Sequence, residues 1–291
     1  MIPLKRLLWL VPALLILLIA SACADTVTIP SGLTEIPEGM FDGSSGLDRV
    51  VIGSNITSIG SRAFAGSSVA TVSIADSVTY IADDAFDDLQ NDVIVYTAST
   101  YVSNYCEDHG IICNPSDMEA AFAKYTCVKA DWWNSDIQGI FFQRTTSGGY
   151  TVSECVAQVY DIWTGLTYTI RRVGGDNHAD IEPYTKEDTA ILCQTQGVSD
   201  PSQIDAGTPY YKRRPCLLLV GTHLYACSMY AVPHDPGYRS DANHLLNNGL
   251  NGYVMCLWFV NSKGHGSGKT DSDHAAAINT AYNWWLTKYG K

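Results

Sequence analysis

Apolar residues recur at a fixed period in the first third of the chain. The segments "VTIPSGLTEIPEGMFDG", "VVIGSNITSIGSRAFAG" and "VSIADSVTYIADDAFDD" align with steps of 23 and 22 residues. Four apolar columns match in all three copies: Ile29, Ile52 and Ile74; Leu33, Ile56 and Val78; Ile36, Ile59 and Ile81; Phe41, Phe64 and Phe86. A period of this length is typical of a solenoid, whose repeats bury their apolar sides against their neighbours. The V-x-I pieces predict short strands, and the A-F-x-G pieces predict helical turns that carry Phe inward.

The repeat pattern resembles the leucine-rich repeats of bacterial surface antigens, of the "IxxIGxxAFxGC" type, over residues 26–112. "VIVYTASTYVSNYCEDHGI" is similar to the end piece of such arrays, a last strand followed by a short helix. The resemblance implies a surface interaction module without catalysis, whose partner would be a protein or another surface ligand. The alternative is that three repeats only display the domain that follows.

The pattern changes after the repeats. "NPSDMEAAFAKYTCVKAD" begins with a capping box, Ser116 and Glu119, and predicts a helix over about 117–129 that links the two parts. From Gly139 onward the segments are rich in β-formers, and we expect "GIFFQR", "VAQVYDI" and "TYTIRRV" to be strands. "CLLLVGTHLYACSMYAV" predicts a hairpin that turns near Gly221.

Two further elements complete the C-terminal part. "GYVMCLWFV" predicts a short apolar strand, and "SDHAAAINTAYNWWLTKYG" predicts a helix that is capped by Ser272 or Asp271 and ended by Gly290. The predicted fold class is α+β: a short leucine-rich-repeat solenoid followed by a mainly antiparallel β domain with flanking helices. We expect the repeats with their end cap over 25–113, a helical linker over 114–138 and the α+β domain over 139–291.

The N-terminus has the pattern of an export signal. Lys5 and Arg6 precede an apolar stretch of fourteen residues, which is short for a membrane span, and "SACAD" follows it. Three outcomes remain open: a signal peptide over 1–24 cleaved before Asp25, a lipoprotein signal that leaves Cys23 lipidated, or an uncleaved anchor. All three place residues 25–291 outside the cytoplasm, at the cell surface or in the extracellular space. We expect contact with the membrane only through such an anchor.

Charge is distributed unevenly. The net charge is −12, and residues 25–113 carry thirteen Asp and Glu against two Arg. Residues 114–291 carry seventeen acidic and fourteen basic side chains, so that half is nearly neutral. An acidic module repels polyanions, which excludes nucleic acid and anionic lipid surfaces as expected partners.

The chain has nine cysteines, and export would permit disulfides between them. Eight cysteines remain after Cys23, and they allow 105 disulfide connectivities, so spacing alone fixes none of them. Cys256 lies in the apolar run "VMCLWF", and three interpretations of it compete. It is a packed residue of a buried strand, a catalytic nucleophile, or one half of a disulfide in a stapled scaffold.

The nucleophile interpretation needs a base or a cation near the thiol. His234 lies upstream of Cys256 in "AVPHDPGY", and His265 lies downstream in the glycine-rich "KGHGSGK". Loops that a rigid sheet holds often carry function, and these three elements can converge at one edge of the sheet. The histidines of the last seventy residues show no helical H-x-x-x-H spacing, so we expect no metal site and no cofactor.

The order histidine, glycine-rich loop and strand cysteine resembles the L,D-transpeptidases, which crosslink peptidoglycan through a cysteine thioester. "GGDNHADIEP", "SMYAVPHD" and "CLWFVNSKGHGSGKTDSDHAAAI" are more similar to an exported Firmicutes domain with the pattern GGxNHADxEP, SMxxMPHG and GHxCIHFxNSxTHGxxxxDxxHQAA, over about 150–285. That domain often accompanies wall-binding modules. Val254 and Trp258 stand where it has histidines, two residues before and two residues after the cysteine.

The resemblance implies roles for five residues. Cys256 would be the nucleophile, His234 the general base, His178 and Asp180 supporting groups, and His265 a wall of the pocket. The expected activity is acyl transfer on the stem peptides of peptidoglycan. The competing interpretation is a non-catalytic surface binding or adhesion protein whose C-terminal domain is degenerate.

Overall fold

The computed structural model describes residues 26–90, 93–141, 156–198, 212–234 and 253–290. The proposed signal segment and Cys23 lie outside the described residues. Contacts divide the chain after Asp117 into two compact units. We call residues 26–117 the repeat module and residues 118–290 the C-terminal domain. Among the described residues, no helix has the length and apolar character needed to cross a membrane.

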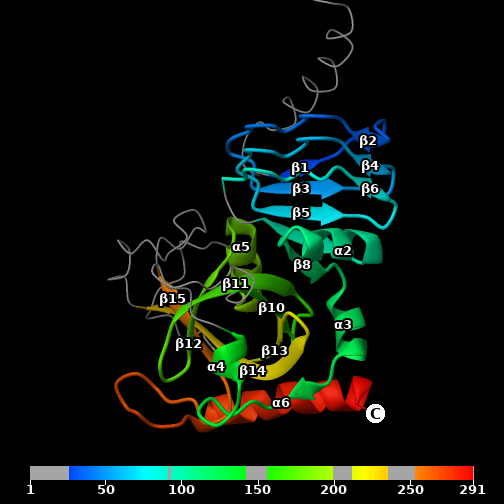
Figure 1. Ribbon diagram of the computed structural model, residues 1–291. Coiled ribbons are helices and arrows are strands. Elements are labelled where there is room, and N and C mark those ends of the chain that lie inside the picture. The colour runs from blue at the N-terminus through cyan, green and yellow to red at the C-terminus, as the bar shows by residue number, and fades with distance from the viewer. Residues whose placement is uncertain (1–25, 91–92, 142–155, 199–211, 235–252, 291) are drawn as a thin grey trace, which may run out of the picture. The chain divides into compact units, whose positions relative to one another are not determined.

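The repeat module stacks its strands in two parallel ladders (Figure 1). The five-stranded ladder has the order β1-β3-β5-β7-β8, and the three-stranded ladder has the order β2-β4-β6. Strands of the first ladder are β1 (Thr26–Thr28), β3 (Arg49–Ile52), β5 (Thr71–Ile74), β7 (Ile94–Thr97) and β8 (Ile112–Pro115); those of the second are β2 (Glu35–Ile36), β4 (Ser58–Ile59) and β6 (Tyr80–Ile81). Val50 pairs with Val72 and Ile59 with Ile81, which is the register that the sequence period predicts.

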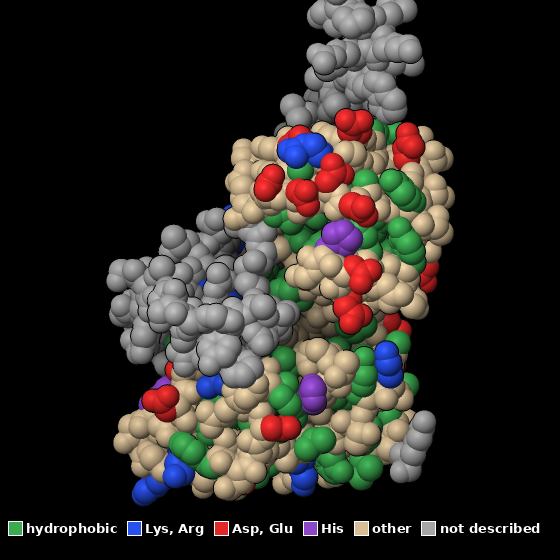
Figure 2. Space-filling view, in the orientation of Figure 1, with side chains coloured by type: hydrophobic (Ala, Val, Ile, Leu, Met, Phe, Trp, Pro, Cys, Tyr) green, Lys and Arg blue, Asp and Glu red, His purple; other side chains and the backbone are tan. Residues whose placement is uncertain are grey.

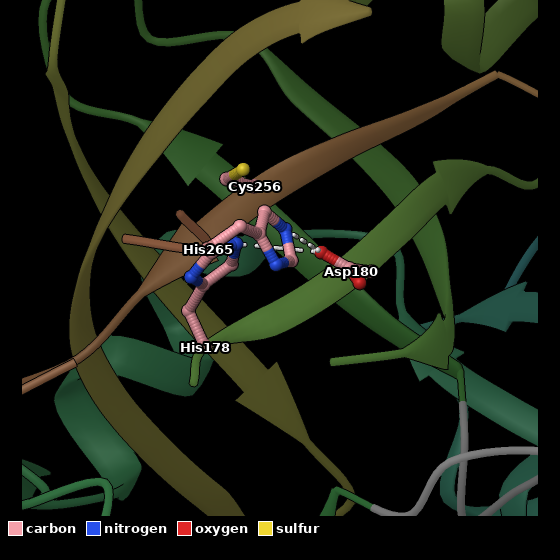
Figure 3. Close-up of side chains that lie close together, drawn as sticks. All are labelled: His178, Asp180, Cys256 and His265. Carbon is pink, nitrogen blue, oxygen red and sulfur yellow. Dashed lines mark ion pairs between the residues drawn. The ribbon is translucent and has the colours of Figure 1, made fainter. Parts of the chain in front are cut away.

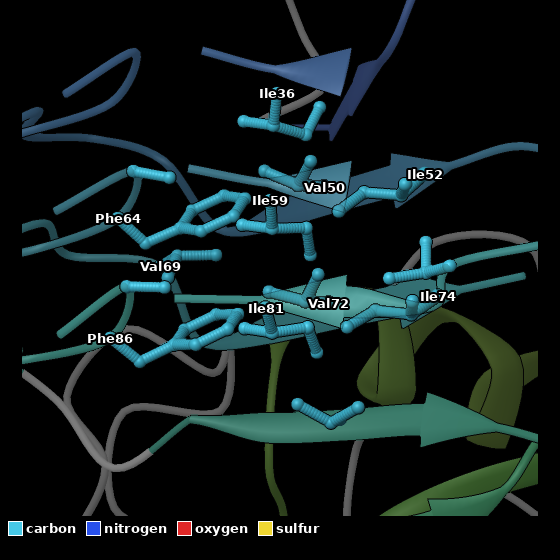
Figure 4. Packing of buried hydrophobic residues seen from close by; sticks show 14 of the residues in the cluster. Ile36, Val50, Ile52, Ile59, Phe64, Val69, Val72, Ile74, Ile81 and Phe86 are labelled. Atoms are coloured by element: carbon cyan, nitrogen blue, oxygen red, sulfur yellow. The ribbon is translucent and has the colours of Figure 1, made fainter. Parts of the chain in front are cut away.

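The aligned apolar columns form the core of this module (Figure 4). Phe41, Phe64 and Phe86 stack with ring centroids 5.1 and 4.9 Å apart. Every residue of the four columns is buried except Leu33, which packs against the core from its edge. Each repeat therefore buries its apolar residues mainly against the next repeat, as a solenoid requires.

An end cap closes the ladder. Helix α2 (Thr100–Asp108) follows β7, as the sequence predicts, and Ser99 caps it by accepting a hydrogen bond from the amide of Val102. Its Tyr105 hydroxyl donates to the carbonyl oxygen of Ala82 at 3.0 Å. The strand β8, which the sequence did not indicate, then pairs in parallel with β7.

The C-terminal domain is built on a mainly antiparallel sheet with the order β13-β10-β11-β12-β15-β14-β9, in which only the β14–β9 pair is parallel among the described strands. Strands β13 and β14 also pair with each other, so six of the seven strands form a closed ring. The strands are β9 (Cys127–Val128), β10 (Val156–Asp161), β11 (Thr167–Gly174), β12 (Ala179–Pro183), β13 (Arg214–Val220), β14 (His223–His234) and β15 (Val254–Trp258). Closure removes the edges of those six strands, which would otherwise need protection.

Strands β13 and β14 are buried on both faces, by the core inside the ring and by helix α6 (Ser272–Tyr289) outside it. Leu218 and Met229 belong to the core inside the ring, whereas Leu217 and Ala226 face a second apolar cluster under this helix. Alternate residues of a strand point to opposite faces, so "CLLLV" is apolar throughout because both faces are buried. Asp271 caps α6 by accepting from two amides of its first turn, and α5 (Lys186–Thr195) begins with a capping box.

The junction differs from the prediction. The expected helix over 117–129 ends early, since α3 covers Met118–Lys124 and Cys127–Val128 pair with β14 as strand β9. Trp132 is fully buried in the ring core, so much of the expected linker over 114–138 belongs to the C-terminal domain. The expected strand "GIFFQR" is wrong at its start, because α4 covers Ile137–Ile140; residues 142–144 lie outside the described residues.

Candidate functional site

Strand alternation decides on which face Cys256 lies. Met255 and Leu257 point into the core of the ring, so Cys256 and Trp258 face the opposite side. The same alternation on the neighbouring strand β12 sends Ile181 into the core and Asp180 to the outer face. Cys256 is therefore not part of the ring core, although it is buried.

Strand register then brings the site together. Asp180 lies directly opposite Cys256 in the β12–β15 pair, and Tyr230 lies opposite it in the β14–β15 pair. His178 precedes β12, and His265 comes from the glycine-rich loop after β15 (Figure 3). One potential ligand atom from each of His178, Asp180, Cys256 and His265 lies within 4.8 Å of all the others. We call these four residues the Cys256 cluster.

Backbone contacts fix the two histidine-bearing segments to each other. The amide of Lys263 donates to the carbonyl oxygen of Asn177 at 2.9 Å, and Nδ1 of His178 donates to the carbonyl oxygen of Lys263 at 2.7 Å. Within the loop, the amide of Gly264 donates to the carbonyl oxygen of Lys269. The "KGHGSGK" loop is thus a closed turn that holds His265 over the end of β12.

The hydrogen bond to Lys263 also sets the chemistry of His178. Because Nδ1 carries the proton that this bond needs, Nε2 is left to face Oδ1 of Asp180 at 3.4 Å. Nε2 of His265 faces the same oxygen at 3.2 Å. The lone pair that neutral His178 would have at Nε2 would face a carboxylate oxygen, so protonation of this ring, or a cation bound beside it, would be favourable.

The pKa directions agree with protonated rings. Burial lowers the pKa of His178, but hydrogen bonds with Asp180 and Cys256 outweigh it and raise this pKa to about 10. A hydrogen bond with Cys256 is the main reason that the pKa of His265 is raised. Cationic imidazoles beside a thiol favour its thiolate form, which is the nucleophilic form.

A stack of three rings supports the cluster. Trp258 lies between His178, at 4.9 Å, and His274 of α6, at 4.0 Å, with nearly parallel planes. Burial lowers the pKa of His274 to about 3, so this histidine is neutral, and it shares a hydrogen bond of 2.8 Å with the hydroxyl of Ser228. Trp258, which departs from the family pattern, thus packs against His178 and helps to hold it in place.

A pocket opens next to the cluster. Its volume is about 590 Å³, and Tyr230, Cys256, Trp258, His265 and His274 are among the residues that line it. Arg213 also lines the pocket; it lies over the ring of Tyr230 and pairs with Asp271 at 2.9 Å. The cluster is therefore reachable by a molecule of peptide or small-ligand size.

His234 has a different position from the one expected. Its backbone does not lie in a loop: it is the last residue of β14 and pairs with Val254 on β15, two residues from Cys256. Its side chain lies outside the described residues, so its assignment as the general base stays a prediction. The histidines that the described part of the chain places against Cys256 are His178 and His265.

The same four residues have the donor types that Zn²⁺ accepts. A histidine that ligates a metal usually donates its other ring N–H to a carbonyl or carboxylate, and His178 does so to Lys263. Sequence spacing did not indicate this set, because its members come from three separate segments. Strand register, which local spacing does not reveal, brings them together.

The repeat module presents a second kind of surface. Asp and Glu side chains gather on the face of this module that Figure 2 shows, next to basic side chains. Arg62 pairs with Asp42 at 3.2 Å, and the carboxylate of Asp84 accepts from the hydroxyl of Ser61. These contacts join successive repeats, so the acidic residues also order the turns of the solenoid.

Comparisons with known proteins separate the two parts of the chain. No curated protein and no solved structure matches it. A match to a family model covers the repeats and ends before the C-terminal domain, so this match says nothing of what that domain does. Residues 20–106 match the model of the BspA-type leucine-rich repeat region, in six copies, which supports the leucine-rich-repeat interpretation of the N-terminal part of this chain.

Proposed function

We propose that the chain is an exported cell-envelope protein whose repeats bind a surface ligand and whose C-terminal domain transfers acyl groups through Cys256. The observation that supports the catalytic part is the convergence of Cys256 with two histidines and a carboxylate beside an open pocket. Nucleophile, base and orienting group within reach of one another are the arrangement that thiol catalysis requires. The stem peptides of peptidoglycan are the proposed substrates, and this choice rests on the resemblance of the motifs.

The proposed reaction assigns a role to each member. The thiolate of Cys256 attacks the carbonyl carbon of the donor, and protonated His265 gives its proton to the leaving amine as the C–N bond breaks. An acceptor amine or water then attacks the thioester, neutral His265 takes the proton of the acceptor, and the C–S bond breaks to restore the thiolate. His265 suits this exchange because its side chain is 48% exposed.

Buried His178 has a positioning role. Lys263, Trp258 and Asp180 fix its ring, and its positive charge stabilises the thiolate between turnovers. Asp180 contacts both imidazoles, so it orients them and balances their charge.

Turnover of a stem peptide tests this proposal. The full chain is incubated with a tetrapeptide or pentapeptide stem, with and without an amine acceptor, and the products are separated by chromatography. Cys256→Ala should abolish product formation, whereas Cys193→Ala, which removes another buried thiol, should leave it unchanged. His265→Gln and His234→Gln, compared side by side, identify the base. Equal turnover by wild type and Cys256→Ala would reject the catalytic role.

Attachment without catalysis is the competing function. Retention of Cys256→Ala on purified cell wall, together with no product from wild type, would favour it. Deleting the repeats would then show which part of the chain binds the wall.

Zinc binding at the Cys256 cluster is a second candidate function. Its support is the mutual distance of the four donor atoms and the carbonyl partner of His178. Metal analysis of protein purified without chelator separates the two: one zinc per chain, lost in Cys256→Ser, would favour a metal site over a free thiolate.

A further inference from the structure

Two cysteines of the end cap lie beside each other, far in sequence from Cys256. Cys106 belongs to α2 and Cys113 to β8. Between them the chain reverses at Gly110, whose φ of +66° is the left-handed conformation that glycine adopts readily. The amide of Ile111 donates to the carbonyl oxygen of Cys106 at 2.8 Å, which returns β8 along the end of α2.

The two thiol groups contact each other. A hydrogen bond joins them; it is the main reason that the pKa of Cys106 is raised and that the pKa of Cys113 falls to about 7. The hydroxyl of Ser103 lies 3.5 Å from Sγ of Cys113 and gives it a second polar partner. Cys106 is buried, whereas Cys113 is partly exposed.

We propose that Cys106 and Cys113 form a reversible disulfide that closes the end cap of the repeat module. The two cysteines lie beside each other on α2 and β8, which a short turn connects, so a disulfide can form between them. Cys113 is partly exposed, so an oxidant can reach its thiol. This inference concerns the repeat module and is independent of the chemistry at Cys256.

Another close cysteine pair serves as a contrast. Cys216 and Cys227 lie directly opposite each other on β13 and β14, but both are fully buried. Burial raises the pKa of each thiol, and neither is open to a reagent. The end-cap pair is therefore the better candidate for a reversible disulfide, because Cys113 is partly exposed and its thiolate forms more readily than those of Cys216 and Cys227.

The oxidant is a small disulfide of the glutathione type. The Cys113 thiolate attacks one sulfur of that disulfide, the S–S bond breaks, and the first small thiolate leaves. The sulfur of Cys106 then gives up its proton and attacks the mixed disulfide at Cys113, which releases the second small thiolate. The protein loses two electrons and two protons, and the small disulfide is reduced to two thiols.

Closure should stabilise the end of the solenoid. Terminal repeats lack a neighbour on one side, so their caps limit fraying. A loop of eight residues, Cys106 to Cys113, is short, and its closure should raise the melting temperature of the module by about 10 °C.

Peptide mapping of the full chain tests the pairing. Reduced protein is treated with oxidised glutathione, and free thiols are blocked with a maleimide under denaturing conditions. Glu-C protease can cut after Glu107, between the two cysteines, so a disulfide leaves the two fragments linked until a reductant is added. We expect the linked fragments, and a maleimide label on Cys216 and on Cys227 within the peptide that carries them.

Several results would overturn the proposal: separate labelling of Cys106 and Cys113, a glutathione adduct that persists on Cys113, or equal oxidation of the end-cap and strand pairs. Thermal unfolding gives a second readout, since reduction should lower the melting temperature of wild type but not of Cys113→Ser. The partly exposed position of Cys113 tolerates serine better than that of Cys106. Equal melting temperatures of oxidised and reduced wild type would contradict a stabilising disulfide between Cys106 and Cys113.

Discussion

The two histidines on either side of Trp258 allow one prediction to be worked out in detail. His178 contacts the Cys256 cluster, whereas His274 stacks on the other face of Trp258 and is neutral at ordinary pH. We therefore compare His178→Gln with His274→Gln. Glutamine can donate to the carbonyl oxygen of Lys263 as His178 does, so the first change removes the charge but keeps a donor.

The magnitude follows from the charge. An opposite charge within about 4–6 Å shifts an ionisation equilibrium by about one to three pH units. Loss of the His178 cation should therefore lower the acid dissociation constant of the Cys256 thiol by about tenfold to a thousandfold, and the thiolate population at pH 7 should fall by up to that factor. His274→Gln leaves this charge in place and should change the thiolate population by about twofold or less.

The rate of iodoacetamide modification at Cys256, followed by mass spectrometry of its peptide, reports the thiolate. Circular dichroism shows whether each variant is folded. Wild-type rates in His178→Gln would refute the thiolate–imidazolium pair. Equal losses in the two variants would show instead that the ring stack, rather than the charge, controls Cys256.

Three further predictions concern stability and thiol chemistry. Phe64 is fully buried in the middle of the stack of three phenylalanine rings, so Phe64→Ala should lower the free energy of unfolding in urea by about 3–5 kcal/mol. A decrease of less than 1 kcal/mol would contradict the stacked core. Asp161→Ala leaves the buried guanidinium of Arg214 without its carboxylate and should also cost about 3–5 kcal/mol, whereas unchanged unfolding would show that water replaces the pair. In the reduced protein, the Cys106 thiol lowers the pKa of Cys113 to about 7, so the alkylation rate of Cys113 should reach half its maximum near pH 7. Cys106→Ala should move this midpoint to higher pH. An unchanged midpoint would contradict the contact between the two thiols.

Much of the repeat module could be predicted from its sequence, because each repeat contacts mainly its neighbours. Ile59 and Ile81 lie one period apart and meet in the structure. The added strand β8 was missed since "ICNP" is too short and too polar to show a period. A parallel partner, β7, makes it a strand, and the local pattern does not reveal that partner.

The C-terminal domain was harder to predict where both faces of a strand are buried. In "VMCLWFV" nearly every residue is apolar, so no alternation reveals on which face Cys256 lies. The face follows from the packing of Met255 and Leu257 into the ring core. The pairing of Cys256 with Asp180 joins strands that lie more than seventy residues apart in sequence.

Motif resemblance singled out His178, Asp180 and His265, and the structure places all three beside Cys256. The resemblance gave the role of general base to His234 and only minor roles to His178 and His265. Among the described side chains, His178 and His265 are the histidines that lie beside the thiol of Cys256. Trp258 was noted as a departure from the family pattern, yet the ring stack gives it a supporting role that its position in the sequence did not suggest.

The mass of the intact protein after reaction with an activated acyl donor, such as a peptide thioester, tests the central claim most directly. Every protein compared also carries Cys113→Ser, because the thiol of the end cap is itself reactive. If the Cys256 cluster activates its thiol, the wild-type and Cys193→Ala proteins on this background should each gain one acyl group that peptide mapping assigns to Cys256, and Cys256→Ala should gain none. The same gain in Cys256→Ala, or no gain in wild type under conditions in which free cysteine is acylated, would contradict the account.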